Sequence, residues 1–228
     1  MLGTKMPSLY RYLSERHLEK FLQSGEMLFR SLSYYRDYEE DNGVRSDELE
    51  GTRVHLPKEG LKLNLVETGQ EVLLPNHRFE STANENDIFV FCLSTVFSES
   101  IAERFKAKYC VEICEPSKFI CTLRGALARR PSIKDKLLVF DSLKYYEPWH
   151  PPIIDWALPE RIALSKPQSF SWQHEYRIAF SKNNAFDVEN VRVNLAPLEN
   201  RAKFKSSEHP KLKLKAGKIS GFCKVHSF

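Results

Sequence analysis

The sequence predicts an α+β fold: a split or packed pair of small, mostly antiparallel sheets with short flanking helices. Short apolar runs of strand length recur along the chain, at 88–93 and 109–113 among others, whereas segments with helical periodicity are few and short. The 15 Phe and 9 Tyr residues give a density of rings that is typical of a sheet-rich core or an aromatic pocket. We expect residues 1–228 to form a single domain, with its core at about 8–198 and a basic C-terminal segment at 199–228.

The first elements follow the order strand, helix, strand. Residues 9–13 are rich in Tyr and apolar side chains, which predicts a strand. Ser14 is a suitable N-cap for a helix over 14–24, where apolar residues repeat at helical spacing, and Gly25 can adopt the left-handed conformation that ends a helix. A second strand is predicted at 27–32.

The rest of the chain alternates polar loops with short strands and helices. Residues 36–51 are strongly polar and predict a long surface loop, and apolar alternation within 53–81 predicts an exposed hairpin. Further strands are predicted at 88–93, 109–113, 137–146, 176–180, 191–195 and 219–225, and further helices at 99–106, 116–129 and 155–165.

Positive charge is concentrated at the C-terminal end. The net charge is only +4, but residues 201–228 hold eight Lys or Arg and a single Glu. Lys and Leu alternate from Lys211 to Lys215, which predicts a strand with one exposed face. Such a segment attracts nucleic acid, acidic protein or anionic lipid, or serves solubility alone, and the sequence leaves both interpretations open.

The five cysteines and the hydropathy pattern indicate a cytoplasmic protein. The cysteines are odd in number and form no Cys-x-x-Cys pair, which is typical of reduced thiols and gives no support to a metal site. No apolar run reaches the roughly 18 residues needed to cross a membrane, and the N-terminus lacks the apolar run of a secretory signal. We therefore expect no membrane association and no bound metal.

Three segments carry candidate chemistry. They are Leu-Tyr-Arg-Tyr around Arg11, Cys-Leu-Ser-Thr around Ser94 and Thr95, and Trp-Gln-His-Glu-Tyr-Arg around Glu175. Taken singly, each has an ordinary structural interpretation: Arg11 as a surface residue, Ser94 as a strand end, and Glu175 with Arg177 as an ion pair.

In this order the three segments resemble the Arg–Ser–Glu branch of the ADP-ribosyltransferase superfamily. They resemble more closely a family of uncharacterised bacterial proteins with a Leu-Tyr-Lys/Arg-Tyr strand, a Cys/Ser-Leu-Ser strand and a Trp-x-x-Glu-x-Arg segment. The resemblance spans roughly residues 8–180. It implies an ADP-ribosyltransferase-like fold and NAD as substrate. It also implies transfer of ADP-ribose to a protein, RNA or DNA acceptor, in a toxin or phage-defence setting.

The resemblance also implies roles for individual residues. Arg11 would hold the pyrophosphate of NAD, Glu175 would stabilise the ribosyl cation, Ser94 would support the site and Gln173 would face the acceptor. The other residues expected to contact NAD are Tyr12, Tyr34, Tyr35, Thr95 and Trp172. The middle motif lacks its second Ser, and Gln173 stands where other members have Glu. In the family that these motifs resemble, the Gln form is associated with acceptors other than arginine, and it leaves cleavage by water possible.

Two other interpretations remain open at this level. A domain of the same fold that has lost its activity would bind nucleotide or nucleic acid through its basic segment without making a bond. The acidic loop also has the alternation of a calcium site at Asp37, Glu39 and Asp41, with Glu48 at the twelfth place, but its glycine is one residue late at Gly43. Alternatively, residues of this loop, such as Arg36, Arg45 and Glu50, help to shape the ligand pocket.

Overall fold

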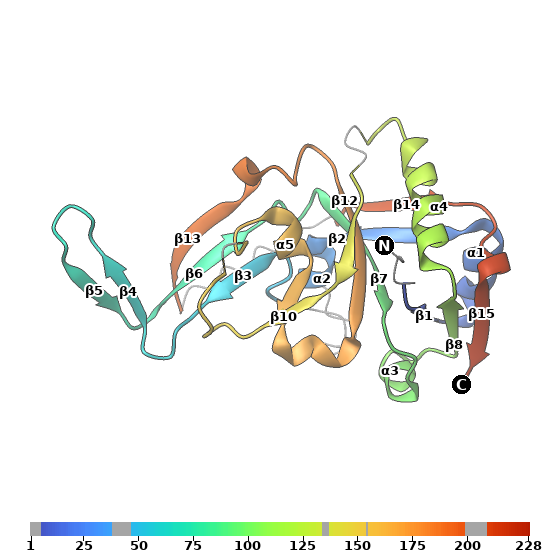
Figure 1. Ribbon diagram of the computed structural model, residues 1–228, viewed down its shortest axis with the longest axis horizontal. Coiled ribbons are helices and arrows are strands. Elements are labelled where there is room, and N and C mark those ends of the chain that lie inside the picture. The colour runs from blue at the N-terminus through green and yellow to red at the C-terminus, as the bar shows by residue number, and fades with distance from the viewer. Residues whose placement is uncertain (1–5, 38–46, 134–136, 154, 199–208) are drawn as a thin grey trace, which may run out of the picture.

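An eight-stranded antiparallel sheet dominates the computed structural model, which describes residues 6–37, 47–133, 137–153, 155–198 and 209–228 (Figure 1). Its strands are β1 (Leu9–Leu13), β2 (Glu26–Ser31), β7 (Ile88–Ser94), β8 (Tyr109–Ile113), β9 (Val139–Ser142), β12 (Glu175–Ser181), β14 (Lys211–Lys215) and β15 (Cys223–Ser227). One path runs β14-β2-β7-β1-β8-β15, and β12 and then β9 extend the sheet from β7.

Strand β7 is the point where this sheet splits. One edge of β7 pairs along its whole length with β12, from Ser94 opposite Glu175 to Ile88 opposite Ser181. The other edge is shared, because β2 pairs with it near Val90 and β1 pairs with it at Ser94. Among the described strands, none pairs with β7 between these two points on that edge. The sheet therefore opens between β1 and β2.

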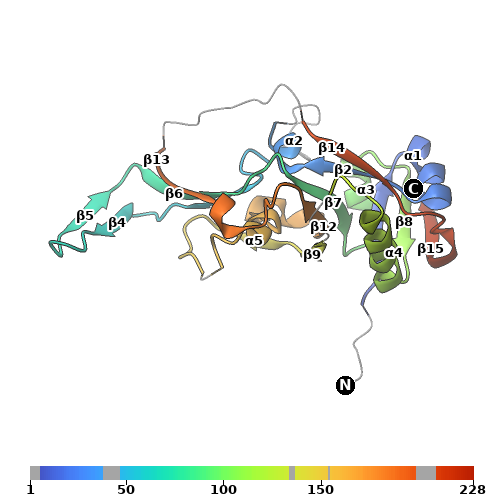
Figure 2. The same cartoon turned by 90° about the horizontal axis from the view of Figure 1, so that it is seen from above.

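Three smaller sheets lie beside the main one. Strands β3 (Thr52–His55), β6 (His77–Thr82) and β13 (Arg192–Pro197) form an antiparallel sheet in the order β13-β6-β3. The predicted hairpin is confirmed as β4 (Leu61–Asn64) and β5 (Glu71–Leu74), which project as an arm at the end opposite α4 (Figures 1 and 2). A short parallel pair joins β10 (Lys144–Tyr146) to β11 (Ser165–Pro167).

The helices are short, as the sequence predicts. They are α1 (Glu15–Ser24), α2 (Leu32–Asp37), α3 (Glu99–Arg104), α4 (Pro116–Ala128) and α5 (Pro159–Ala163), with 3₁₀ turns η1 (Gln168–Gln173), η2 (Val188–Asn190) and η3 (Ser220–Phe222). Gly25 ends α1 in the left-handed conformation, and its N–H donates to the carbonyl of Lys20. No helix in the described part of the chain is long and apolar enough to cross a membrane.

The helix predicted over 155–165 is wrong at both ends. Residues 155–157 form a turn, α5 begins at Pro159, and Ser165 already belongs to β11. Proline fixes a helical φ and lacks the N–H that a first helical turn leaves unpaired, so it favours a helix start at this residue. Periodicity alone could not show that the residues from Ser165 onward would pair with β10 as a strand.

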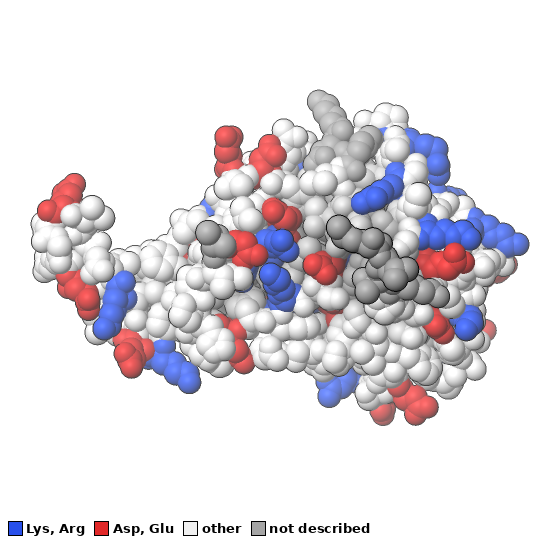
Figure 3. Space-filling model, viewed as in Figure 1, with Lys and Arg blue, Asp and Glu red and all other residues white. Residues whose placement is uncertain are grey.

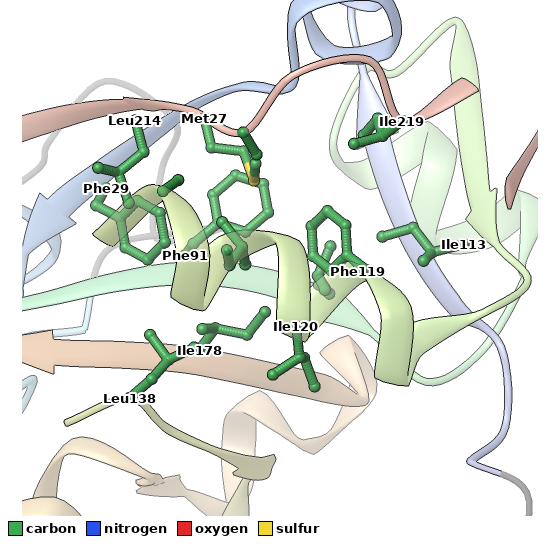
Figure 4. Close-up of a cluster of buried hydrophobic side chains, with 14 of the residues drawn as sticks. Met27, Phe29, Phe91, Ile113, Phe119, Ile120, Leu138, Ile178, Leu214 and Ile219 are labelled. Atoms are coloured by element: carbon green, nitrogen blue, oxygen red, sulfur yellow. The ribbon is translucent and has the colours of Figure 1, made fainter. Parts of the chain in front are cut away.

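The larger core lies between α4 and the main sheet (Figure 4). Phe119 and Ile120 of α4 pack against side chains such as Phe29, Phe91 and Ile178 from the strands, and all five are nearly inaccessible to water. Burial of each such side chain contributes about 1.5–3 kcal/mol to folding. A second core lies on the opposite face of β7 and β12. These two strands lie between α4 and α5 in Figure 1.

The basic C-terminal segment is part of the main sheet. Strand β14 pairs with β2 and β15 pairs with β8, so both occupy outer positions of the sheet. Leu214, Ile219 and Phe222 are buried in the larger core. The predicted alternation of the Lys-Leu strand is confirmed, because its lysines are exposed while Leu214 is buried. The core therefore extends beyond the expected boundary at residue 198.

Candidate active site

The split in the main sheet opens into a cavity of about 530 Å³. Its walls come from β1, α1, β2, α2 and β7, and from the start of β12. Among the described residues, two glutamates line it, Glu26 and Glu175. The lysines and arginines of the lining are Arg11, Arg16, Lys20, Arg30, Lys106, Lys166 and Lys213. The cavity is thus strongly basic, and its size falls within the range typical of small-molecule sites.

Arg11 bridges the split. Its Nη1 donates to the backbone carbonyl of Cys92, in the stretch of β7 that lies between the two strand partners. Its guanidinium lies 4.5 Å from the ring centroid of Phe91. A buried backbone carbonyl needs a hydrogen-bond donor. Here the Arg11 side chain supplies the donor that a neighbouring strand would otherwise supply. The same cation lines the cavity.

Next to the cavity lies a buried ion cluster of four residues, Glu50, Lys166, Glu175 and Arg177. Arg177 is fully buried and forms a bidentate pair with Glu50, with distances of 2.5 and 2.7 Å. Its Nε also donates to Glu175 Oε1 at 2.6 Å. The Lys166 Nζ lies 3.0 Å from Glu175 Oε2 and 3.8 Å from Glu50 Oε2. Two acids and two bases therefore balance each other away from water, as buried charges require.

Glu175 is ionised at physiological pH. Burial opposes its charge, but Arg177 and Lys166 outweigh burial and lower the pKa of Glu175 to about 2. Burial likewise opposes the charge of Lys166, yet Glu175 and Glu50 raise the pKa of its ammonium group. Within the described structure, Glu175 is the cluster's acid that lines the cavity, and its side chain is only 5% exposed.

The backbone around Glu175 is fixed by several contacts. His174 adopts a left-handed conformation with φ of 43°, which ends η1 and starts β12 at Glu175. The Glu175 N–H donates to the Tyr145 hydroxyl at 2.8 Å, and the Thr95 N–H donates to the His174 carbonyl at 2.8 Å. These contacts fix the backbone from which the Glu175 side chain projects.

Ser94 lies directly opposite Glu175 in the pairing of β7 with β12. Its hydroxyl donates to the Gln173 carbonyl at 3.1 Å and accepts from the Val96 N–H at 3.2 Å. Ser94 is therefore the strand partner of Glu175, and its hydroxyl holds the segment before β12 in place.

Seven of the nine residues expected at the site line the cavity. They are Arg11, Tyr12, Tyr34, Tyr35, Ser94, Gln173 and Glu175. Gln173 is the last residue of η1, two residues before the Glu175 that begins β12. Its side-chain oxygen accepts from Lys166 Nζ at 3.1 Å.

Thr95 and Trp172 lie outside the cavity lining. Thr95 donates from both its N–H and its hydroxyl to the His174 carbonyl, so it joins β7 to the turn before β12. The Trp172 ring packs against Phe105, with centroids 5.5 Å apart, and the Arg104 guanidinium lies 4.6 Å from it. These contacts give both residues supporting roles in the described structure.

The predicted polar loop includes buried residues. Asp47 and Glu50 are both almost inaccessible to water, which corrects the prediction of a surface loop for this end of the segment. Glu50 is buried because it neutralises the charge of Arg177. Of the calcium-site residues, Glu39 and Asp41 lie outside the described residues, and Asp37 pairs with Arg36. No group of three or more His, Cys, Asp or Glu in the described part of the chain is arranged to hold a metal.

Sequence reasoning missed Lys166. This lysine belongs to no motif and directly follows the helix predicted at 155–165, and lysines are almost never fully buried unless they are paired. Cys92 also lines the cavity. Burial raises the pKa of its thiol to about 12, so it is not a thiolate nucleophile at neutral pH.

The geometry suits an anionic ligand with aromatic groups. The cavity combines an excess of cations with the rings of Tyr10, Tyr12, Tyr34 and Tyr35, and the ionised carboxylate of Glu175 lies in its wall. Comparisons of the chain with protein-family models, with curated proteins and with solved structures gave no match. The function of the site is therefore argued from its geometry.

Proposed function

We propose that this chain is an NAD-dependent ADP-ribosyltransferase. It cleaves the nicotinamide–ribose bond of NAD in the cavity and transfers ADP-ribose to a macromolecular acceptor. The observation that supports this most strongly is the split of the main sheet, which brings Arg11, Ser94 and Glu175 from three strands to one cavity. The sequence resemblance adds a toxin or phage-defence setting in the bacterial cytoplasm to the proposal.

The composition of the cavity supports NAD as the ligand. NAD carries a pyrophosphate between two aromatic groups, so it needs cations flanked by flat apolar surfaces. Arg11 offers a guanidinium, the group that binds phosphate oxygens best through paired hydrogen bonds. Tyr34 and Tyr35 lie with ring centroids 5.2 Å apart in an edge-to-face arrangement and provide surfaces for stacking.

Glu175 supplies the electrostatic part of the reaction. Cleavage of the bond between ribose C1′ and the nicotinamide nitrogen develops positive charge on the ribose. The ionised Glu175 carboxylate lies in the wall of the cavity, where a fixed charge stabilises such a cation without reorganisation. Lys166 and Arg177 each hold one of the two carboxylate oxygens and thereby set the orientation of the carboxylate.

The proposed transfer needs no reactant other than NAD and the acceptor. The C1′–nitrogen bond breaks, and nicotinamide leaves as a neutral molecule with the electron pair. A nitrogen or oxygen of the acceptor forms the new bond to C1′ and releases one proton to water. The Gln173 amide also lines the cavity and would contact the acceptor.

The test is nicotinamide release by the purified protein, with two matched variants. Glu175→Gln removes the charge that faces the cavity, whereas Glu50→Gln removes the other acid of the same ion cluster, which does not line the cavity. We expect Glu175→Gln to lower the rate by about 10²–10³, the effect of losing one transition-state contact. Glu50→Gln should retain release in proportion to its folded fraction. Equal losses in both variants would contradict the catalytic role of Glu175.

One observation favours a second candidate function. Both oxygens of Glu175 are already paired with buried cations, so the same geometry would suit a module that binds a nucleotide and leaves it intact. Calorimetry distinguishes the two functions. NAD binding without nicotinamide release, in the presence of protein, RNA or DNA, would establish the binding module.

A further inference from the structure

The cavity opens onto a surface with more positive charge than a dinucleotide needs. We define the basic rim as Arg16, Lys20, Arg30, Lys211, Lys213 and Lys215. Four of these residues line the cavity: Arg16 and Lys20 from α1, Arg30 from β2 and Lys213 from β14. The two phosphates of NAD can be matched by Arg11 and one neighbour, so most of the rim is left for another anion.

The pairing of β14 with β2 orders the rim. Lys211 lies opposite Arg30 and Lys215 lies opposite Glu26, so these side chains share one face of the sheet. The residues between them on β2, Met27 and Phe29, face the larger core. Lysines two positions apart on a strand are about 6.6–6.8 Å apart, which gives a regular row of charges along the outer strand β14.

Few acids compensate this row. Glu26 pairs with Lys213 at 3.0 Å, and this contact, with further contributions from Lys20 and Lys215, lowers the pKa of Glu26. One described carboxylate thus lies among at least three ammonium groups. Leu214 faces the core beneath α4, so the β14 lysines lie on the opposite face of the sheet from α4. Figure 3 views the α4 face, where Lys and Arg are interspersed with Asp and Glu. A row of positive charges such as the rim attracts polyanions.

A planar surface lies at the junction of the rim and the cavity. The Arg30 guanidinium lies 4.1 Å from the ring centroid of Tyr34, and both residues line the cavity. Grooves that bind single-stranded nucleic acid combine tracked phosphates with aromatic and Arg surfaces on which bases stack. An acidic peptide would use the charges but not the stacked pair, so the two features together favour a nucleic acid.

We infer that the basic rim binds the phosphate backbone of a single-stranded nucleic acid and delivers one of its nucleotides to the cavity as the acceptor of ADP-ribose. This inference rests on the proposed function for the transfer step, but the binding itself does not depend on it. In the transfer, a nitrogen or oxygen of the nucleotide bonds to C1′ as nicotinamide leaves, and its proton passes to water.

The first measurement is binding of short fluorescein-labelled RNA and DNA of mixed sequence, without NAD, followed by anisotropy over about 50–200 mM salt. The variant Lys211→Gln/Lys215→Gln is compared with Lys58→Gln/Lys62→Gln, which changes two lysines near or on the projecting hairpin. We expect the rim variant to bind more weakly and to lose about 1.4 from the slope of log K against log salt, for two phosphate contacts. The hairpin variant should bind like the wild type.

Several outcomes would overturn the inference. They are equal affinities for the two variants, no binding by the wild type, or equally tight binding of polyglutamate and oligonucleotide. The second measurement follows transfer of label from radioactive NAD. Label on the oligonucleotide supports the inference, and nicotinamide release that leaves the oligonucleotide unlabelled overturns the acceptor role. If nicotinamide is never released, the proposed enzyme fails while the binding measurement still decides the role of the rim.

Discussion

Lys166 Nζ lies 3.0 Å from Glu175 Oε2, and the two side chains are buried together in the wall of the cavity. Arg177 holds the other oxygen of Glu175, so the carboxylate is fixed between two cations. The arrangement serves stability and chemistry at once, because the charges that fold the wall also keep Glu175 ionised. Effects of mutation at this position must therefore be separated into folding and reaction.

Replacement of Glu175 by Ala should lower the free energy of unfolding by about 3–5 kcal/mol, because it leaves the two buried cations Lys166 and Arg177 with the single carboxylate of Glu50. Lys166→Met in the Glu175→Ala background should recover part of the loss. The control is Lys144→Met, which breaks a 3.6 Å pair with Asp155 where the lysine is 55% exposed, and should cost less than about 1 kcal/mol. Urea denaturation measures all of these variants, and similar costs for Glu175→Ala and Lys144→Met would contradict the prediction.

Asp47 should make stability depend on pH. Burial, together with the charge of Glu50, raises the pKa of Asp47 from 3.8 to about 6, and its Oδ2 accepts no hydrogen bond from the described residues. Between about pH 4 and 6 the folded chain holds a proton that the unfolded chain has released, so the free energy of unfolding falls as the pH rises.

Asp47→Asn should therefore raise the free energy of unfolding at pH 7 by about 1–3 kcal/mol and remove this part of the pH dependence. The Asn side-chain oxygen can still accept from the Leu49 N–H, as Asp47 Oδ1 does at 2.9 Å. The measurement is urea denaturation of both proteins from pH 4 to 7. Parallel curves for the two proteins would show that Asp47 does not titrate in this range.

Arg11→Lys should weaken NAD binding by roughly tenfold to hundredfold, the range expected for lost charge-assisted hydrogen bonds. Lysine keeps the positive charge but lacks the planar fork that fits a phosphate. The matched control is Arg124→Lys on α4, whose guanidinium lies 5.3 Å from the Phe140 ring centroid and outside the cavity. Isothermal calorimetry compares the two, and equal affinities would remove Arg11 from the binding site.

Gly25→Ala should destabilise the fold by more than about 1 kcal/mol. Gly25 has a φ of 57°, and an added Cβ would lie 2.4 Å from the Gly217 carbonyl oxygen, which is a backbone atom. Gly69→Ala provides the comparison, because Gly69 has a φ of 67° but no atom within 4 Å of an added Cβ. Thermal unfolding should show a larger loss for Gly25→Ala, and equal losses would mean that the close contact relaxes without cost.

Much of the secondary structure could be predicted because strand-length apolar runs are a local signal. The strand at 109–113 is predicted at its observed bounds, and that at 88–93 ends one residue short of β7. The split of the main sheet could not be predicted, because it depends on which strands pair with β7 at each of its ends. Such pairing is a long-range property that a local pattern does not carry.

The candidate site shows the same division. Arg11, Ser94 and Glu175 could be selected because they lie in short motifs, and the structure brings them to one cavity. Lys166 could not, because a lone lysine in sequence is normally exposed, and only the pairing of β11 with β10 places it against Glu175. A charged residue can be buried only where an opposite charge pairs with it. Which residues pair in this way depends on the folded arrangement of distant segments and is not visible in a local sequence pattern.

The Cys92 carbonyl, which accepts a hydrogen bond from Arg11, competes with any anion that enters the cavity for the same guanidinium. A phosphate that draws the guanidinium away leaves a buried carbonyl without its donor, at a cost of about 1–3 kcal/mol. Weakly charged metabolites would not recover that cost from one contact, whereas a pyrophosphate that engages Arg11 and a second cation would. The split in the main sheet would thus select ligands by their negative charge, because ligands with too little charge would bind too weakly to displace the Cys92 carbonyl from Arg11.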